Sequence, residues 1–238
     1  MNTEIPVVIL CGGYGTRISE ETKIKPKPMV LIGKKPILLH IMNIYKHYGY
    51  KNFILALGYK SHYIKNYFSK KKIENINIKF VYTGKETMTG GRLLRLKKYL
   101  KDKTLFMLTY GDGLSSVNIK QLLEFHLKHK KIATLTAVKP PVRFGELILK
   151  NENVISFKEK PQASSGWING GFFIFSNKIF NFIKNDKIML EREPLEKLVK
   201  INQIKAFKHS GFWQCMDTLR DKILLNKIYR SKKIPWKT

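Results

Sequence analysis

Cysteine, acidic residues and long apolar runs are scarce in this sequence, and each scarcity excludes a class of protein. The two cysteines, Cys11 and Cys215, are too few for a disulfide framework, and with the six histidines they form no cluster that has zinc-site spacing. No apolar run approaches the ~20 residues that a membrane-spanning helix needs. The first residues also lack the basic and apolar regions of a signal peptide. We therefore expect a soluble protein of the reducing cytoplasm with no membrane partner.

The acidic residues are too few to balance the basic ones. The sequence has 17 Asp and Glu against 45 Lys and Arg, which gives a formal net charge of +28 at pH 7. A nucleic acid, an acidic membrane surface or a phosphorylated small substrate would each attract such a charge. The basic residues are spread along the chain, however, and Lys, Asn and Ile are abundant throughout. We attribute most of the charge to compositional bias and expect no nucleic-acid partner.

Apolar strands alternate with helical patterns up to residue 138. Hydrophobic residues make up 43% of the sequence, which is enough for a packed core. The apolar patterns predict strands at residues 7–10, 53–57, 76–82, 104–110 and 133–138. They predict helices at residues 36–45, around 64–68, at 89–100 and at 118–129. This alternation is typical of a doubly wound α/β sheet.

The second half of the sequence follows a different pattern. Its predicted strands are two short ones around the turn 151–153, one at 167–175 and one at 204–207. Its predicted helices are at 178–183, 194–200 and 218–229. No internal repeat or Pro/Ser-rich linker divides the chain. We expect a single domain, 1–238, whose residues 141–238 form a substrate-binding elaboration on the half at 1–140.

A glycine-rich segment follows the first strand. Gly12, Gly13 and Gly15 let the backbone turn and expose successive N–H groups to an anion. Four cations and two stiffening prolines follow, namely Arg17, Lys23, Lys25, Lys27, Pro26 and Pro28. The combination suits a nucleoside triphosphate, although an ordinary turn beside a solvated basic loop has the same spacing. A Walker A motif needs Gly-Lys-Ser/Thr where this loop has Gly-Thr-Arg, and no GxGxxG pattern is present, so ATPase and dehydrogenase functions are disfavoured.

Two aspartates stand where a metal ligand would be useful. Asp112 follows the strand 104–110, at the sheet edge where open α/β proteins bind ligands. A carboxylate beside a phosphate loop is a natural Mg²⁺ ligand, although Asp112 could instead cap the next segment. Asp217 precedes the last helix, and the residues alone favour an N-cap there. Covalent catalysis has no candidate, because no histidine is paired with a nucleophile and Cys11 is expected to be a small buried side chain.

Several motifs, taken in order, resemble the signature of the sugar-phosphate nucleotidyltransferases. They are LCGGYGTR at 10–17, KPKPM at 25–29, GDG at 111–113, EKP at 159–161 and NGG at 169–171. Further segments resemble the glucose-1-phosphate cytidylyltransferases within that family, namely SEET at 19–22, MTGGR at 88–92, YGDG at 110–113, FWQCMDTLRDK at 212–222 and PWKT at 235–238. The resemblance covers essentially the whole chain. It implies a Rossmann-like nucleotidyltransferase fold, with a mixed, mostly parallel sheet flanked by helices and a small β-rich elaboration in the second half.

The resemblance also implies a reaction, and it assigns the binding of each substrate to a different half of the chain. CTP and α-D-glucose 1-phosphate would give CDP-glucose and pyrophosphate with Mg²⁺, in nucleotide-sugar and O-antigen biosynthesis. The nucleotide would bind in the half at 1–140 and the sugar phosphate in the half at 141–238. Because the sugar phosphate is itself the nucleophile, the protein needs only to align two polyanions and neutralise their charge. UTP, dTTP or another sugar 1-phosphate stays open as an alternative, as does a catalytically silent nucleotide-sugar-binding homologue.

Roles are implied residue by residue. Asp112 and Asp217 would hold Mg²⁺, and Glu159 and Asn169 would lie near the sugar. Three cations would act in catalysis, on the triphosphate, the leaving pyrophosphate and the sugar phosphate: Arg17, Lys27 and Lys160. The nucleotide would contact Leu10, Cys11, Gly12, Gly13, Tyr14, Gly15, Thr16, Arg17, Lys27, Thr87, Arg92 and Gly111. Within that set, the Gly12–Gly13 backbone, Arg92 and Thr87 would recognise cytosine.

This sequence departs from the family pattern in two places. Cys11 stands where the family usually has alanine, a small change. The segment 69–77 is much shorter than the family's usual connection, which takes part in subunit contacts. The sequence therefore leaves open whether the chain forms a homo-oligomer.

Overall fold

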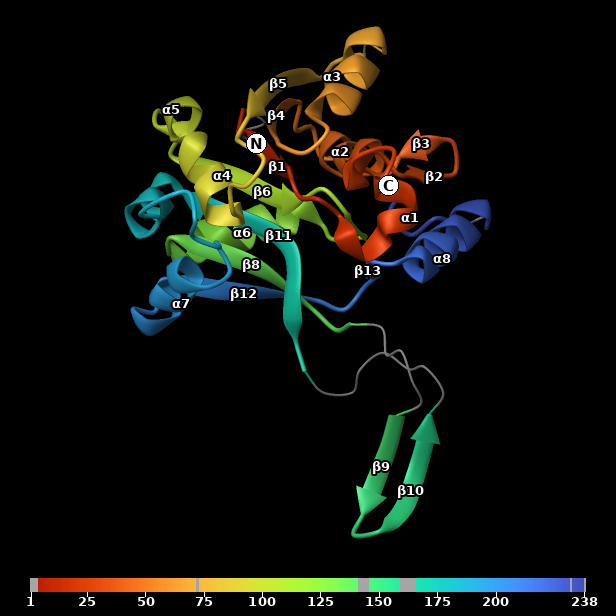
Figure 1. Ribbon diagram of the computed structural model, residues 1–238. Coiled ribbons are helices and arrows are strands. Elements are labelled where there is room, and N and C mark those ends of the chain that lie inside the picture. Colours follow the sequence, from red (N-terminus) through yellow and green to blue (C-terminus); the bar gives the residue numbers. More distant parts are fainter. Residues whose placement is uncertain (1–3, 72, 141–145, 159–165, 232, 238) are drawn as a thin grey trace.

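The computed structural model describes residues 4–71, 73–140, 146–158, 166–231 and 233–237. Its centre is a seven-stranded sheet in the order β12-β8-β11-β6-β1-β4-β5, with helices on both faces (Figure 1). These strands are β1 (Val7–Cys11), β4 (Asn52–Leu57), β5 (Asn77–Tyr82), β6 (Leu105–Tyr110), β8 (Ala133–Val138), β11 (Ile168–Ser176) and β12 (Ile204–His209). Only β11 is antiparallel to its neighbours. The predicted mixed, mostly parallel sheet is therefore confirmed.

The helices divide between two apolar clusters, one on each face of the sheet. The first cluster contains buried residues of α2 (Ile37–His47), α3 (Ser61–Lys70), α6 (Ile119–His129) and α8 (Leu219–Arg230). The second contains those of α4 (Thr89–Arg95), α5 (Lys97–Leu100) and α7 (Glu193–Lys200). Short helical segments are α1 (Ser19–Thr22) and the 3-10 turns η1 (Thr16–Ile18), η2 (Lys27–Met29) and η3 (Asn177–Phe182).

β1, an interior strand of the sheet, shows why the first strand is a continuous apolar run. Val7 and Ile9 belong to one cluster, and Val8 and Leu10 belong to the other. A parallel strand covered by helices on both faces has no solvent side, so its sequence does not alternate. The strand therefore ends abruptly at the carboxyl edge of the sheet, where the glycine-rich loop begins.

Small sheets complete the fold. The hairpin predicted around 151–153 is present as β9 (Glu146–Lys150) and β10 (Asn153–Lys158), an antiparallel pair separate from the main sheet. A register shift between Asn169 and Phe173 shows that the NGG segment forms an irregularity in β11. The division into functional halves at residue 140 stays a prediction.

Two short pairings have no sequence signal. β7 (Gly113–Ser115) pairs with β13 (Trp213–Cys215), and β2 (Leu31–Ile32) pairs with β3 (Lys35–Pro36). Each of these strands has two or three residues, which is too few to show an alternating pattern. The first pairing matters most, because it joins the segment after Asp112 to the segment before Asp217.

The helix boundaries in the structure differ from the sequence predictions at three places. The helix predicted at 89–100 is broken at Leu96, whose N–H donates to Leu93 O in a tighter turn. The helix predicted at 178–183 is instead the 3-10 segment η3, which ends at Phe182. The last helix begins at Leu219, and its N-cap is Thr218, not Asp217. Thr218 and Asp221 form a capping box, in which the carboxylate of Asp221 accepts the N–H groups of Thr218 and Asp217. The carboxylate of Asp217 takes no part in this cap.

Two histidines of α6, the buried His126 and the half-buried His129, contact Thr134 of β8. Nδ1 of His126 lies 2.8 Å from the hydroxyl oxygen of Thr134, and Nε2 of His129 lies 2.7 Å from the same oxygen. Because the N–H of Lys131 donates to Nδ1 of His129, Nε2 of His129 must donate to Thr134. Thr134 then donates to His126, whose Nδ1 is unprotonated. Burial, together with the neighbouring His129, lowers the pKa of His126 to about 4.

We expect the protein to lose stability as the pH falls from about 6.5 to about 4. In this window the unfolded chain protonates His126 whereas the folded chain does not, which costs about 3 kcal/mol over the whole window. His126→Asn should keep the acceptor and flatten this part of the profile. Urea midpoints between pH 7 and 4 would test it, with His47→Asn on the exposed end of α2 as the control. Parallel profiles for wild type and His126→Asn would contradict the prediction.

Among the described residues, no helix is long and apolar enough to cross a membrane.

Candidate active site

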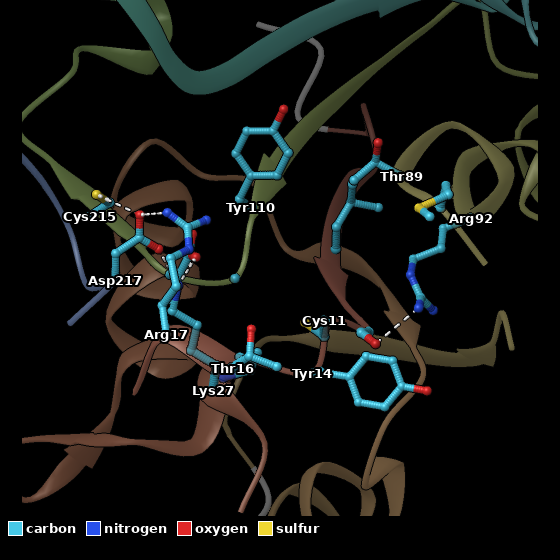
Figure 2. Close-up of a pocket in the computed structure, with 18 of the residues that line it drawn as sticks. Cys11, Tyr14, Thr16, Arg17, Lys27, Thr89, Arg92, Tyr110, Cys215 and Asp217 are labelled. Carbon is cyan, nitrogen blue, oxygen red and sulfur yellow. Dashed lines mark hydrogen bonds and ion pairs between the residues drawn. The ribbon is translucent and has the colours of Figure 1, made fainter. Parts of the chain in front are cut away.

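A cavity of about 660 Å³ lies at the carboxyl ends of β1 and β6 (Figure 2). This is the edge at which open α/β sheets bind ligands. The residues predicted to bind nucleotide all line it: Leu10, Cys11, Gly12, Gly13, Tyr14, Gly15, Thr16, Arg17, Lys27, Thr87, Arg92 and Gly111. Asp112, Asp217 and Asn169 line it as well. Glu159 and Lys160 lie outside the described residues, so their placement and their roles stay predictions.

The glycine-rich loop begins where β1 ends. Cys11 is 1% exposed, and burial raises the pKa of its thiol, so it is the small inert side chain that the sequence predicts. Gly15 has φ of +69°, a left-handed conformation that favours glycine. The hydroxyl of Thr22 donates to Gly15 O at 3.0 Å and to Ile18 O at 3.1 Å. These bonds tie the end of the loop to α1.

Two carboxylates and two cations meet at one end of the cavity. Nζ of Lys27 lies 2.7 Å from Oδ2 of Asp112 and 2.5 Å from Oδ1 of Asp217, and Nη1 of Arg17 lies 2.7 Å from Oδ2 of Asp217. Burial opposes the charge on Lys27, but the two aspartates outweigh it and raise its pKa. Burial also opposes the charge on Asp217, yet Lys27 and Arg17 hold its pKa below the usual range. The Lys27–Asp217 pair is therefore ionised at neutral pH.

These carboxylates could hold a divalent cation. Because one ammonium group reaches both, the carboxylates of Asp112 and Asp217 face a common point. Within the described part of the chain, no three His, Cys, Asp or Glu residues form a metal-binding group. A cation at this point would therefore also need water or ligand oxygens, which is how Mg²⁺ is commonly bound. The donor set fits Mg²⁺, and the metal role of the two aspartates stays a prediction.

Arg92 lies at the opposite side of the cavity, beyond Tyr14 (Figure 2). Its side chain is buried, and Nη2 donates to Gly12 O at 2.9 Å. Nη1 donates to Gly84 O at 2.7 Å and to the hydroxyl of Thr83 at 2.9 Å. These bonds fix the glycine-rich loop against the turn at residue 84. Direct contact of Arg92 with cytosine stays a prediction, and the hydrogen bonds give its guanidinium a further role in positioning backbone.

We expect Gly12→Ala to destabilise the protein by about 1–3 kcal/mol, the usual cost of overpacking. The added Cβ would lie 2.1 Å from Nη1 of Arg92, which cannot move without breaking its bonds to buried carbonyls. Gly13→Ala is the matched control, since no atom lies within 4 Å of its added Cβ. Urea denaturation would compare the two variants. Equal midpoints would contradict this packing role of Gly12.

A third group of polar side chains in the cavity lining is joined by hydrogen bonds. The hydroxyl of Tyr110 donates to Oε1 of Glu191 at 2.5 Å, and the hydroxyl of Thr89 donates to Oε2 at 2.6 Å. Nδ2 of Asn169 lies 3.5 Å from the hydroxyl oxygen of Tyr110. Burial, followed by the charge of Glu191, raises the pKa of Tyr110, which therefore stays a neutral donor. The network joins β6, β11, α4 and the segment before α7.

Sequence reasoning assigned no role to several lining residues, namely Pro28, Lys85, Glu86, Met88, Thr89, Tyr110, Glu191, Trp213 and Cys215. Thr89 and Tyr110 belong to motifs already singled out, so adjacency could have identified them. Glu191 lies in no motif and in a segment of mixed charge. Only the fold brings it to the cavity.

Comparisons with known proteins agree with this geometry. The family model described as Nucleotidyl transferase matches residues 6–216. A Salmonella typhimurium protein named glucose-1-phosphate cytidylyltransferase is 47% identical over 97% of this chain and 98% of its own length. A Bacillus subtilis protein named probable glucose-1-phosphate cytidylyltransferase is 41% identical over the same shares. The crystal structure of HddC from Yersinia pseudotuberculosis, complexed with GMP-PN, has a TM-score of 0.76 and 29% identity over 95% of this chain and 100% of that chain.

These similarities extend over nearly the whole chain. The alignment with the Salmonella protein spans 252 residues, more than the 238 present here, so that protein has residues that this chain lacks. The family model, the near full-length relatives and the shared fold agree on one assignment. The chain belongs to the nucleotidyl transferase family, and within it to the glucose-1-phosphate cytidylyltransferases.

Proposed function

We propose that the protein catalyses the reaction of CTP with α-D-glucose 1-phosphate to give CDP-glucose and pyrophosphate. The observation that carries the proposal is 47% identity, over nearly both full lengths, to a protein that bears the name of this activity. The cavity supports it, because it gathers a glycine-rich loop, two cations and two carboxylates, the groups that a charged triphosphate and a divalent cation need.

The proposed chemistry is an in-line displacement at the α-phosphate of CTP. An oxygen of the sugar phosphate forms a bond to the α-phosphorus, and the bond from that phosphorus to the oxygen bridging to the β-phosphate breaks. The electron pair of the broken bond leaves with pyrophosphate. No side chain needs to form a covalent intermediate. Arg17 and Lys27 would neutralise the triphosphate and stabilise the leaving group, because cations aimed at developing negative charge lower the barrier.

Asp112 and Asp217 are the residues that would hold Mg²⁺. When bound, Mg²⁺ neutralises phosphate charge and orients the reacting groups. Lys160 is proposed to bind the sugar phosphate, with Glu159 and Asn169 near the sugar. The backbone of Gly12 and Gly13, with Thr87 and Arg92, is proposed to recognise cytosine.

A cytoplasmic location is proposed with this function, since both substrates are small phosphorylated molecules. Assembly into a homo-oligomer stays a prediction.

Pyrophosphate release in the presence of Mg²⁺ and glucose 1-phosphate tests the proposal. We expect turnover with CTP, and much less with UTP, dTTP, ATP or GTP. The choice of base can depend on one or two contacts. Turnover with UTP or dTTP and none with CTP would therefore change the assigned function to that of another nucleotidyl transferase. Binding of CDP-glucose without pyrophosphate release from any nucleotide would favour the silent homologue.

A further inference from the structure

We propose that Glu191 is a sugar-binding residue, which accepts hydrogen bonds from hydroxyl groups of the sugar 1-phosphate and contributes to the choice of sugar. The inference rests on the proposed function and adds a specificity-determining residue to the same cavity. Glu191 lies just before α7, in the second half of the chain, and its side chain reaches the cavity lining. It is half-buried.

Its carboxylate is fixed before any substrate arrives. Tyr110 donates to one oxygen at 2.5 Å and Thr89 donates to the other at 2.6 Å. The N–H of Leu190 donates to the hydroxyl of Thr89 at 2.9 Å, so that hydroxyl is itself oriented. A carboxylate has about four acceptor positions, and these two bonds occupy about half of them. Glu191 therefore retains acceptor capacity in a rigid geometry, which is what selective recognition needs.

Charge decides which part of a substrate Glu191 can face. Asp112 and Asp217, two other carboxylates of the cavity, are ion-paired with Lys27. Among the described residues, no lysine or arginine forms an ion pair with Glu191 in this way. A carboxylate that has no cation beside it among the described residues repels phosphate groups, so we infer that it faces an uncharged part of the substrate that donates hydrogen bonds. The hydroxyls of the sugar and the amino group of the base meet that condition.

The position of Asn169 favours the sugar. Nδ2 of Asn169 lies 3.5 Å from the Tyr110 hydroxyl that donates to Glu191, so an amide donor and a carboxylate acceptor flank one phenol. A sugar hydroxyl both donates and accepts, and neighbouring hydroxyls of a pyranose can use both groups together. The base amino group can only donate. Asn169 and Glu191 also both come from the half of the chain at 141–238.

Equilibrium binding separates this inference from the proposed function. We expect Glu191→Gln to weaken binding of CDP-glucose by about 10- to 100-fold, the range for losing a hydrogen bond to a charged group, and to leave binding of CDP within about twofold of wild type. Isothermal titration calorimetry measures both ligands without turnover. Equal weakening of CDP and CDP-glucose would assign Glu191 to the nucleotide and overturn the inference. No change for either ligand would overturn it too.

Kinetics with deoxy sugars identifies the contact. In wild type, one of the 2-, 3-, 4- or 6-deoxy analogues of glucose 1-phosphate should have a KM that is raised by a similar factor relative to glucose 1-phosphate. In Glu191→Gln, the KM for that analogue should differ little from the KM for glucose 1-phosphate. Glu193→Gln is the control, because Glu193 pairs with Lys197 on α7 outside the cavity lining. If wild type turns over no CTP with glucose 1-phosphate, the proposed function fails. The calorimetric comparison then still decides the role of Glu191.

Discussion

Asp112→Ala is expected to lower kcat by about 100-fold or more. The carboxylate of Asp112 lies at the end of β6, 2.7 Å from the ammonium group of Lys27, and faces the same point as the carboxylate of Asp217. Removing one of two carboxylates leaves a divalent cation with too few protein ligands, and the charge stabilisation supplied by a metal is worth several kcal/mol. Pyrophosphate release at saturating CTP and glucose 1-phosphate, over a range of Mg²⁺ concentrations, measures the loss.

Two further variants separate a metal role from a structural one. Asp112→Asn keeps the size of the side chain and removes its charge, so it should retain the fold and lose nearly as much activity as the alanine variant. Asp102→Ala removes an exposed carboxylate from the turn after α5 and should leave kcat unchanged. Near-normal turnover in Asp112→Ala would reject Asp112 as a metal ligand.

The sequence predicts the main sheet well because its strands are long and apolar. β1, β4 and β6 are largely buried on both faces, and each contains a run of apolar residues that stands out from the helices between them. The pairing of β7 with β13 has no such signal, because three-residue strands carry no periodicity. That pairing is nevertheless what brings Asp217 to Asp112 across more than a hundred residues of chain.

The candidate site likewise contains residues that the sequence could predict and contacts that it could not. Residues inside motifs, such as Gly12 and Arg92, could be predicted to line one cavity because the motifs have a recognisable order. The individual contacts between these motifs could not be predicted, even for Asp217, to which the resemblance assigns a metal role beside Asp112. Asp217 has the local pattern of a helix cap, and only the structure gives the cap to Thr218 and the aspartate to Lys27. Glu191 lies in no motif, and its position depends on how the segment before α7 packs against α4 and β6.

Lys27→Met is expected to lower kcat/KM for CTP by about 100- to 1,000-fold. That is the range observed when one preorganised group aimed at developing negative charge is removed. Lys25→Met is the matched control two residues away, because Lys25 pairs with Glu21 at 3.4 Å rather than with the aspartates. Equal losses in the two variants would mean that the loop supplies only a general positive field, and would contradict a specific role for Lys27.

The same variant should also respond differently to Mg²⁺ in the absence of nucleotide. In wild type the ammonium group of Lys27 forms an ion pair with both aspartates, so a divalent cation must compete with it. In Lys27→Met, Arg17 on Asp217 is the one cation left in an ion pair with either carboxylate among the described residues, so the two carboxylates should attract Mg²⁺ more strongly. We expect Mg²⁺ at constant ionic strength to raise the Tm of Lys27→Met more than that of wild type or Lys25→Met, because a ligand that binds the folded state stabilises it. An equal rise in Tm in all three proteins would indicate that Mg²⁺ does not bind at the two aspartates, and would contradict the proposed metal site.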